Sequence, residues 1–264
     1  MNNINILEEI RKQSPLVHNI TNYVVMNNTA NALLSIGASP VMAHSKDEVE
    51  DIVSISSSLV INMGTLSEKW IDSMIIAGKK AKLLGKPIVF DPVGVGASKY
   101  RTETAEKIIT EVKPDVIRGN ASEIMALAQL STITKGVDST ARSFEAVDGA
   151  LHLSKKLNNT IIVSGAVDYI VTKEKVTKVG NGSALMSKVT GMGCTATSIV
   201  GACIAVDKDL HNAAVSAMVF MGLAGEKAEK MSDGPGSFQV KFLDALHNLS
   251  ADDPEEKTKV NEES

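Results

Sequence analysis

Residues 190–197 combine the backbone freedom and the polar groups that a chemical site needs. They read Thr-Gly-Met-Gly-Cys-Thr-Ala-Thr and lead into an apolar run over 196–206. The run has about 11 residues, the length of an average helix, and it is apolar on nearly every face, which predicts a buried helix. The unpaired N–H groups and positive dipole end of a helix start bind an anion, most often a phosphate, and Cys194 would lie at its mouth. A plain tight turn before a core helix is the alternative.

Other polar, small or soft residues follow the predicted strands, where ligands bind in open α/β sheets. They are Asn19, Asn22, Met42, His44, Asn62, Gly64, Asp91, Gly94, Gly96, Arg118, Asn120, Glu123, Ser164 and Gly165. Arg118 would either pair with a structural carboxylate or clamp a phosphate. Glu123 would either hold Mg²⁺ through water or complement a helix dipole. Met42, taken alone, would most often fill the core.

Two nucleotide-binding motifs are absent from the sequence. It contains no GxxxxGK[ST] segment, which excludes a P-loop kinase. The Gly94–Gly96 pair has no downstream acidic partner, so it does not make a dinucleotide fingerprint.

The order of the predicted elements indicates an α/β fold. We expect strands over 16–22, 40–44, 59–64, 88–92, 116–120 and 160–165, and helices over 4–13, 24–36, 47–55, 67–84, 102–112, from 121, 139–157, 209–231 and 236–249. Continuous apolar strands that alternate with helices predict a mostly parallel central sheet with helices on both faces. Residues 168–173 and 176–182 break the alternation and predict a short antiparallel hairpin at the sheet edge.

Composition limits the classes of protein that fit. The 264 residues are 44% apolar and 22% charged, with a net charge of −4 and no Lys/Arg block, which argues against nucleic acid as a partner. Neither a signal peptide nor an apolar run long enough to span a membrane is present. Cys194 and Cys203 on one helix would be about 13 Å apart, too far for a disulfide. Free thiols and the lack of an export signal predict a cytoplasmic protein.

The chain shows no internal repeat and no linker, so we expect one domain over residues 1–249. Acidic residues dominate the last part of the sequence, 250–264. Such a segment buries little apolar surface, which predicts a mobile tail.

Seven segments resemble the hydroxyethylthiazole kinases of thiamine salvage, members of the ribokinase-like superfamily. They are His18-Asn19-Ile20-Thr21-Asn22, Pro40-Val41-Met42-Ala43, Asn62-Met63-Gly64-Thr65, Asp91-Pro92-Val93-Gly94-Val95-Gly96-Ala97, Arg118-Gly119-Asn120-Ala121-Ser122-Glu123, Ser164-Gly165-Ala166-Val167-Asp168 and Gly191-Met192-Gly193-Cys194. The resemblance covers residues 10–248. Asn120–Glu123 is similar to the superfamily's N-x-x-E signature, and Gly191–Cys194 is similar to its G-x-G-D anion hole, with Cys in place of the catalytic Asp, as is common in the thiazole-kinase branch.

The resemblance implies a ribokinase-like fold and ATP-dependent phosphorylation of the hydroxyl group of 4-methyl-5-(2-hydroxyethyl)thiazole. It implies a homotrimer with sites near the subunit interfaces, and Mg²⁺ as the cofactor. By position, the implied roles are catalysis for Cys194 and Gly193, thiazole binding for Met42, Gly191 and Asn22, ATP binding for Arg118 and Ser164, and metal binding for Glu123 and Asp91.

Three other functions remain compatible with the sequence. A ribokinase-like kinase for another alcohol, such as a hydroxymethylpyrimidine or a sugar, typically keeps Asp at the position of Cys194. The ATP-dependent dehydratase that repairs hydrated nicotinamide cofactors on the same fold also normally keeps an acidic residue there. A non-enzymatic sensor of the thiazole or of a nucleotide is the third.

Overall fold

The computed structural model describes residues 3–131, 142–250 and 258–263. The helices are α1 (Asn3–Gln13), α2 (Met26–Ile36), α3 (Val49–Ile55), α4 (Glu68–Leu83), α5 (Lys99–Val112), α6 (Ala121–Ser131), α7 (Arg142–Leu157), α8 (Met192–Val206), α9 (Leu210–Lys230) and α10 (Pro235–His247), with a short 3-10 helix η1 (Ala184–Lys188). The strands are β1 (Leu16–Ile20), β2 (Ser39–Val41), β3 (Ser58–Asn62), β4 (Ile88–Asp91), β5 (Val116–Asn120), β6 (Thr160–Ser164), β7 (Asp168–Val171), β8 (Val176–Val179) and β9 (Val260–Glu263).

The strands of the described residues form one sheet in the order β2-β1-β3-β4-β5-β6-β7-β8-β9. Pairing is parallel from β2 through β6 and antiparallel from β6 through β9. The predicted mostly parallel sheet with an antiparallel edge hairpin is therefore confirmed. Because the parallel strands share one direction, their carboxyl ends and following loops meet at one edge of the sheet.

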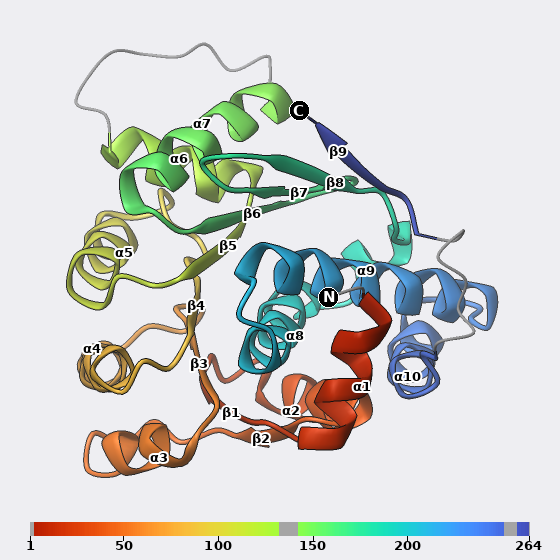
Figure 1. The fold of residues 1–264 in the computed structure, drawn as a ribbon, viewed down its shortest axis with the longest axis horizontal. Helices are drawn as coiled ribbons and strands as arrows, with labels where there is room; N and C mark the ends of the chain where they lie inside the picture. The colour runs from red at the N-terminus through yellow and green to blue at the C-terminus, as the bar shows by residue number, and fades with distance from the viewer. Residues whose placement is uncertain (1–2, 132–141, 251–257, 264) are drawn as a thin grey trace.

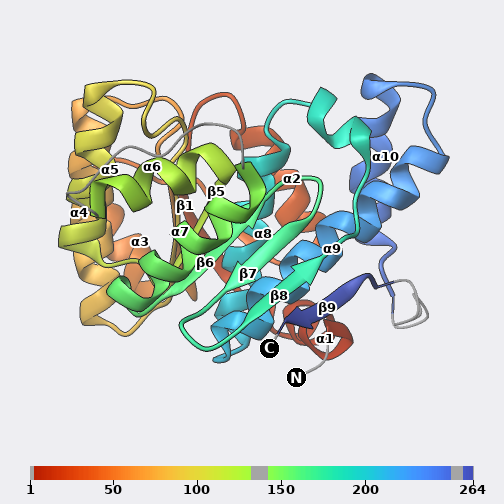
Figure 2. The same ribbon diagram turned by 90° about the horizontal axis from the view of Figure 1, so that it is seen from above.

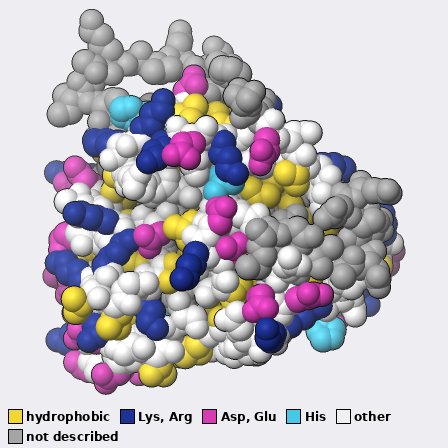
Figure 3. Space-filling model, in the orientation of Figure 1, with side chains coloured by type: hydrophobic (Ala, Val, Ile, Leu, Met, Phe, Trp, Pro, Cys, Tyr) yellow, Lys and Arg dark blue, Asp and Glu magenta, His cyan; other side chains and the backbone are white. Residues whose placement is uncertain are grey.

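Helices cover both faces of the sheet (Figures 1 and 2). One apolar core lies under α1, α2, α8, α9 and α10, and a second lies under α3 to α7. Within β3, Val60 belongs to the first core, whereas Leu59 and Ile61 belong to the second. Burial of both strand faces explains why these strands are continuous apolar runs in the sequence. On the face shown in Figure 3, acidic and basic side chains are interspersed.

Helix α8 is buried, as predicted, but it begins at Met192 rather than at Ala196. Its first turn therefore includes Gly193 and Cys194, which the sequence placed in a preceding loop. Gly201 allows close packing on the sheet, because a Cβ atom there would lie 2.6 Å from Val60 Cγ2. The Ser198 hydroxyl donates to Asn19 Oδ1 at 2.8 Å. This contact helps to fix α8 against the sheet.

Two predicted segments differ from the structure. The predicted mobile tail over 250–264 is wrong for residues 260–263, which form β9 and pair with β8. Val260 opposes Val179 in this pairing, so the acidic segment includes an apolar residue that packs against the core. The helix predicted over 139–157 corresponds to α7, and its first three residues lie outside the described part of the chain.

Candidate active site

Polar side chains at the carboxyl ends of neighbouring strands form one hydrogen-bond network. Asn22 Nδ2 donates to Asn62 Oδ1 at 2.8 Å, and Asn62 Nδ2 donates to Asp91 Oδ2 at 2.9 Å. The Thr197 hydroxyl of α8 donates to the same Asp91 oxygen at 2.7 Å. All four side chains are buried. The network joins the loop after β1 with β3, β4 and α8, and these buried polar groups are satisfied by one another.

The start of α8 lies directly against Arg118. Gly191 precedes the helix with φ of +83°, a left-handed conformation that Gly adopts without steric penalty. A Cβ atom at Gly193 would lie 2.7 Å from Arg118 Nη1, so only Gly lets the guanidinium approach the helix here. A guanidinium beside a helix start places two positive features at one point, which favours an anion.

Arg118 connects β5 with β4 and β6. Its Nη2 atom donates to the Ser164 hydroxyl at 2.5 Å, and its Nη1 atom lies 3.9 Å from Asp91 Oδ2. The side chain is only 12% exposed. The two alternatives for Arg118 are therefore compatible with each other: it lies near a structural carboxylate, and it also faces the helix start.

Two carboxyl groups near Arg118 have raised pKa values. Burial raises the pKa of Asp91 to about 6 against the opposing effect of Arg118, and nearby Glu123 adds to the increase. Burial also raises the pKa of Asp168 to about 6, against a hydrogen bond from the Gly165 amide and the charge of Arg118. A further positive charge nearby would lower the pKa of each carboxyl group and favour its ionised form.

Cys194 lies at the other end of this network. Asn22 Nδ2 donates to the Cys194 sulfur atom at a distance of 3.5 Å. Burial and the charge of Asp91 raise the pKa of the Cys194 thiol to about 11, despite the hydrogen bonds from Asn62 and Asn22. The helix start therefore does not make Cys194 a thiolate at neutral pH.

Glu123 connects two loops at the start of α6. Its Oε2 atom accepts from the Asn120 amide at 2.8 Å, while Asn120 Oδ1 accepts from the Glu123 amide at 3.0 Å. This reciprocal pair is a capping box. The other carboxylate oxygen of Glu123, Oε1, accepts from the Gly94 amide at 2.9 Å. Within the described residues, no group of three or more His, Cys, Asp or Glu side chains is arranged around a common metal position.

Met42 lies apart from this hydrogen-bond network. It is half-buried and follows β2, the outermost parallel strand. An aromatic cluster joins two loops with α4: the Trp70 ring, in the first turn of α4, is 4.6 Å from the rings of Tyr23 and His44. Tyr23 is 64% exposed and Val24 is 60% exposed, which is unusual for such side chains next to a polar site.

Sequence reasoning missed three residues of the site. Arg101 donates to the carbonyl oxygens of Met63, Gly64 and Val93 at 2.6–2.7 Å and so fixes the loops after β3 and β4. Its signal was a basic residue in the first turn of a helix, where the dipole disfavours it. Thr197 is a polar residue inside an apolar helix. Asp168 received no role, although it lies in one of the quoted segments.

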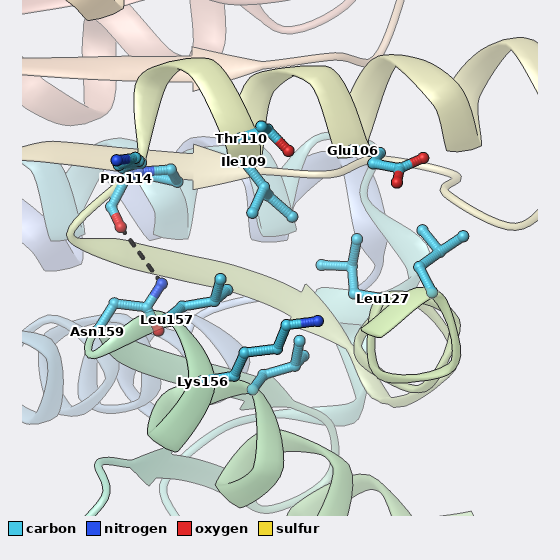
Figure 4. A pocket seen from close by; sticks show the side chains of 11 residues that line it. Glu106, Ile109, Thr110, Pro114, Leu127, Lys156, Leu157 and Asn159 are labelled. Carbon is cyan, nitrogen blue, oxygen red and sulfur yellow. Dashed lines mark hydrogen bonds between the residues drawn. The ribbon is translucent and has the colours of Figure 1, made fainter. Parts of the chain in front are cut away.

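A cavity of about 550 Å³ opens beside Arg118. Its lining includes Arg118, Ser164, Asp168, Asn181, Met192 and Gly193. A second cavity, of about 440 Å³, lies between α5, α6 and α7 at the amino ends of β5 and β6 (Figure 4). The first cavity contains the polar groups that converge on the α8 start, so it is the candidate ligand site.

Comparisons of the structure define the class of the fold. A pyridoxal kinase of Staphylococcus aureus, solved with AMP-PCP, matches with a TM-score of 0.67 at 16% identity, covering 94% of this chain and 99% of that chain. At this identity the match shows the fold alone, which is the ribokinase-like fold.

Closer relatives identify the family. A profile of the hydroxyethylthiazole kinase family matches residues 7–252, and the chain belongs to this family. A hydroxyethylthiazole kinase of Leptospira biflexa is 55% identical, over 97% of this chain and 96% of that protein. One of Desulfotalea psychrophila is 49% identical, over 98% and 94%. The structure of hydroxyethylthiazole kinase from Pyrococcus horikoshii OT3 matches with a TM-score of 0.92 at 42% identity, over 99% of both chains. The prediction of a phosphotransferase enzyme is confirmed.

Among the described residues, no helix is both long enough and apolar enough to cross a membrane.

Proposed function

We propose that this chain transfers the γ-phosphoryl group of ATP to the hydroxyl group of 4-methyl-5-(2-hydroxyethyl)thiazole, in thiamine biosynthesis. The observation that carries the proposal is the position of Arg118 against Gly193 at the start of α8. A cavity opens beside this point, and Cys194 lies in the same helix turn without lining that cavity. The phosphate groups of ATP would therefore lie at the α8 start, between the nucleotide in the cavity and the acceptor alcohol near Cys194.

The nucleotide part of the proposal concerns the cavity of about 550 Å³. Its volume lies within the range of small-molecule sites in proteins. Arg118 and Ser164 line it and are assigned to ATP. The planar guanidinium binds phosphate oxygens through two parallel hydrogen bonds, which an ammonium group does not do.

The acceptor part of the proposal concerns the loops after β1 and β2. Asn22, Gly191 and Met42 are assigned to the thiazole alcohol, with Cys194 next to its hydroxyl group. The contact between Asn22 and Cys194 supports grouping these two residues. The polarizable thioether of Met42 suits a sulfur heterocycle.

Phosphoryl transfer depends mainly on positioning and on neutralising the charge of the transferred group. The N–H groups at the α8 start, around Gly193, supply that stabilisation whatever side chain residue 194 carries. Because the pKa of Cys194 is raised to about 11, the thiol is protonated at neutral pH. We therefore assign Cys194 to positioning the hydroxyl group, with only a modest contribution as a base.

Mg²⁺ is part of the proposal, with Asp91 and Glu123 as the residues that would hold it. Carboxylates are the ligands that Mg²⁺ prefers, and it usually takes only one or two of them besides water and phosphate. The effect of Glu123 on the pKa of Asp91 supports their proximity. When bound, the ion would neutralise phosphate charge. The activation curve for Mg²⁺ should shift in Glu123→Gln; an unchanged curve in a folded variant would remove this role.

A homotrimer with sites near its interfaces, in the cytoplasm, completes the proposal. The exposed Tyr23 and Val24, next to Asn22, support an interface at this place. Light scattering after size-exclusion chromatography measures the assembly directly. Tyr23→Ser should lower the trimer fraction and raise the KM for the thiazole alcohol together.

The experiment that tests the reaction is an ATP-consumption assay with different acceptors. We expect ADP formation to depend on the thiazole alcohol and to match the thiazole phosphate formed. Faster turnover with a hydroxymethylpyrimidine, a sugar or a hydrated nicotinamide cofactor would replace this function with another. Binding of thiazole alcohol and ATP without turnover would indicate a sensor.

A further inference from the structure

The loop between β8 and η1 forms one wall of the cavity assigned to ATP. Gly180, Asn181, Gly182 and Ser183 all line this cavity. The loop lies directly on α9, because a Cβ atom at Gly222 would lie 2.5 Å from Asn181 Cβ. Gly182 has φ of +152°, a conformation that residues with side chains rarely adopt. Because glycine also populates many other conformations, the loop has little intrinsic preference for one shape. The geometry of this wall therefore depends on what holds the loop.

The carboxyl-terminal strand β9 holds the loop through the residue that precedes it. The Gly180 amide donates to the Lys259 carbonyl oxygen at 2.9 Å. The Lys259 amide in turn donates to Asn181 Oδ1 at 2.8 Å. Residues far apart in the sequence are thus joined at the cavity wall by one backbone–backbone and one backbone–side-chain hydrogen bond, next to the pairing of β9 with β8 (Figure 2).

Glu226 of α9 gathers the same groups around one carboxylate oxygen. Its Oε1 atom accepts from the Gly182 amide at 3.2 Å, from Asn181 Nδ2 at 3.2 Å and from Lys259 Nζ at 2.9 Å. The Glu226 side chain is 22% exposed. Although partial burial raises its pKa, the hydrogen bonds from Lys259 and Gly182 hold the pKa below its ordinary value. Such charge-assisted bonds are stronger than neutral ones.

We propose that Glu226 and Lys259 are positioning residues for the nucleotide, and that docking of β9 is coupled to nucleotide binding. This inference rests on the proposed function, since it takes the cavity beside Arg118 as the ATP site. By linkage, if docked β9 favours ATP binding, bound ATP must favour docked β9 by the same factor. A loop held in advance also loses less conformational freedom when the ligand binds.

The first test compares kinetic constants of variants outside the reacting groups. Glu226→Ala removes the acceptor of three donors, and we expect the KM for ATP to rise about 5- to 10-fold while kcat stays within about two-fold. Glu226→Gln keeps an acceptor oxygen without the charge, so its KM should lie between the two. Lys259→Ala, at a side chain that is 62% exposed, should raise the KM without affecting folding.

The matched control lies on β9 itself. Glu262 contacts Lys175 at 3.7 Å, and neither residue lines the cavity. Glu262→Gln should leave both the KM and kcat for ATP unchanged. An equal rise of the KM in Glu262→Gln and Glu226→Ala would mean a general effect on the sheet edge and would overturn the inference.

The second test measures the reverse direction of the coupling by hydrogen exchange. A non-hydrolysable ATP analogue should slow amide exchange of residues 260–263 in the wild-type protein, and this slowing should be lost in Glu226→Ala. No slowing in the wild-type protein at saturating analogue would overturn the coupling.

Arg118→Ala separates this inference from the proposed function. If Arg118→Ala raises the KM for ATP but Glu226→Ala and Lys259→Ala do not, the positioning role is wrong and the ATP site stands. If none of the three changes the KM, the ATP site itself is wrong.

Discussion

The two ends of β5 and β6 are built from the same strands but differ in chemistry. At the carboxyl ends, Arg118 and Ser164 hydrogen-bond to each other beside a cavity of about 550 Å³. At the amino ends, the Asn159 amide group donates to the Pro114 carbonyl oxygen at 3.3 Å beside a cavity of about 440 Å³ (Figure 4). The cavities are similar in volume, so volume does not distinguish a ligand site from a gap between helices.

The direction of the neighbouring helices makes the difference. Helices α6 and α8 begin at the carboxyl ends of the strands, whereas α5 and α7 end near the amino ends. The N–H groups of the α8 start therefore lie at the cavity beside Arg118, and carbonyl groups of the α5 and α7 ends lie at the other cavity. The last turn of α7 carries Lys155 and Lys156, which complement its negative end. The basic residues at the amino-end cavity thus balance the negative end of a helix. Arg118 instead lies at the positive end of α8, so an anion is needed to balance the two positive groups.

Exchange of one basic residue at each end of β5 gives the largest expected effect. Arg118→Ala should lower kcat/KM for ATP by about 10²- to 10³-fold, because it removes a preorganised donor. Lys113→Ala, which lines the amino-end cavity, should leave kcat/KM unchanged. Arg118→Lys should recover only part of the loss, since the planar fork is missing. Steady-state kinetics and calorimetry with ATP measure all three. Equal losses for Arg118→Ala and Lys113→Ala would contradict the contrast between the two ends.

The fold was largely predictable from the sequence because parallel strands buried on both faces leave a clear apolar pattern. The position of β9 was not, since the described part of this acidic segment packs a single apolar residue, Val260, and so has no such pattern. The start of α8 was placed four residues too late because glycines at 191 and 193 suggest a loop. Gly193 is instead needed for the approach of Arg118, which only the tertiary structure shows.

The candidate site was predictable as a set of residues at strand ends, but its connections were not. The link from Asn62 to Asp91 joins residues on separate strands, and nothing in the local sequence specifies it. A helix start on its own would lower the pKa of the Cys194 thiol. Burial near Asp91 has the larger effect and raises that pKa. The roles of the residues stay predictions.

The buried carboxyl group of Asp91 gives the second largest effect, on stability. Its pKa is 3.8 in an unfolded chain and about 6 in the folded protein, so the folded protein holds this proton to higher pH. The free energy of unfolding therefore falls as pH rises from about 4 to about 6, by at most about 3 kcal/mol for this group. Asp91→Asn should remove most of this loss and be more stable than the wild-type protein at pH 7, while losing activity.

Urea unfolding at pH 4.5 and pH 7 measures this difference. Asp168→Asn provides a comparison, because the pKa of Asp168 is also raised to about 6, mainly by burial. We expect a smaller pH dependence in each single variant and the smallest in the double variant. A double variant with the full wild-type pH dependence of stability would show that Asp91 and Asp168 do not cause it.

Cys194 should have a smaller effect, on kcat. Cys194→Ala should lose about 10-fold or less and stay above a no-enzyme control, because the helix backbone carries most of the stabilisation. Cys194→Asp, with the residue of the wider superfamily, should retain or raise kcat. Cys203→Ala, farther along the same buried helix, should keep kcat unchanged. Because the pKa of the thiol is about 11, a reaction that needed the thiolate would show kcat rising tenfold per pH unit between pH 8 and 9.5, and we expect no such rise. A folded, substrate-binding Cys194→Ala without any activity would show that the thiol is indispensable.

Met42 should have the smallest effect, and it tests how far the acceptor site extends across the carboxyl ends of the sheet. The residue is half-buried after β2, away from Arg118 in the strand order. A sulfur–aromatic contact contributes about 0.3–1.5 kcal/mol, so Met42→Ala should raise the KM for the thiazole alcohol about 2- to 10-fold. The KM for ATP should change little, because the nucleotide cavity is lined from β5 and β6, whereas Met42 follows β2 at the far edge of the parallel strands. Leu130→Ala, in the amino-end cavity, should change neither KM. Equal increases of both KM values in Met42→Ala would indicate a folding defect and place the acceptor elsewhere.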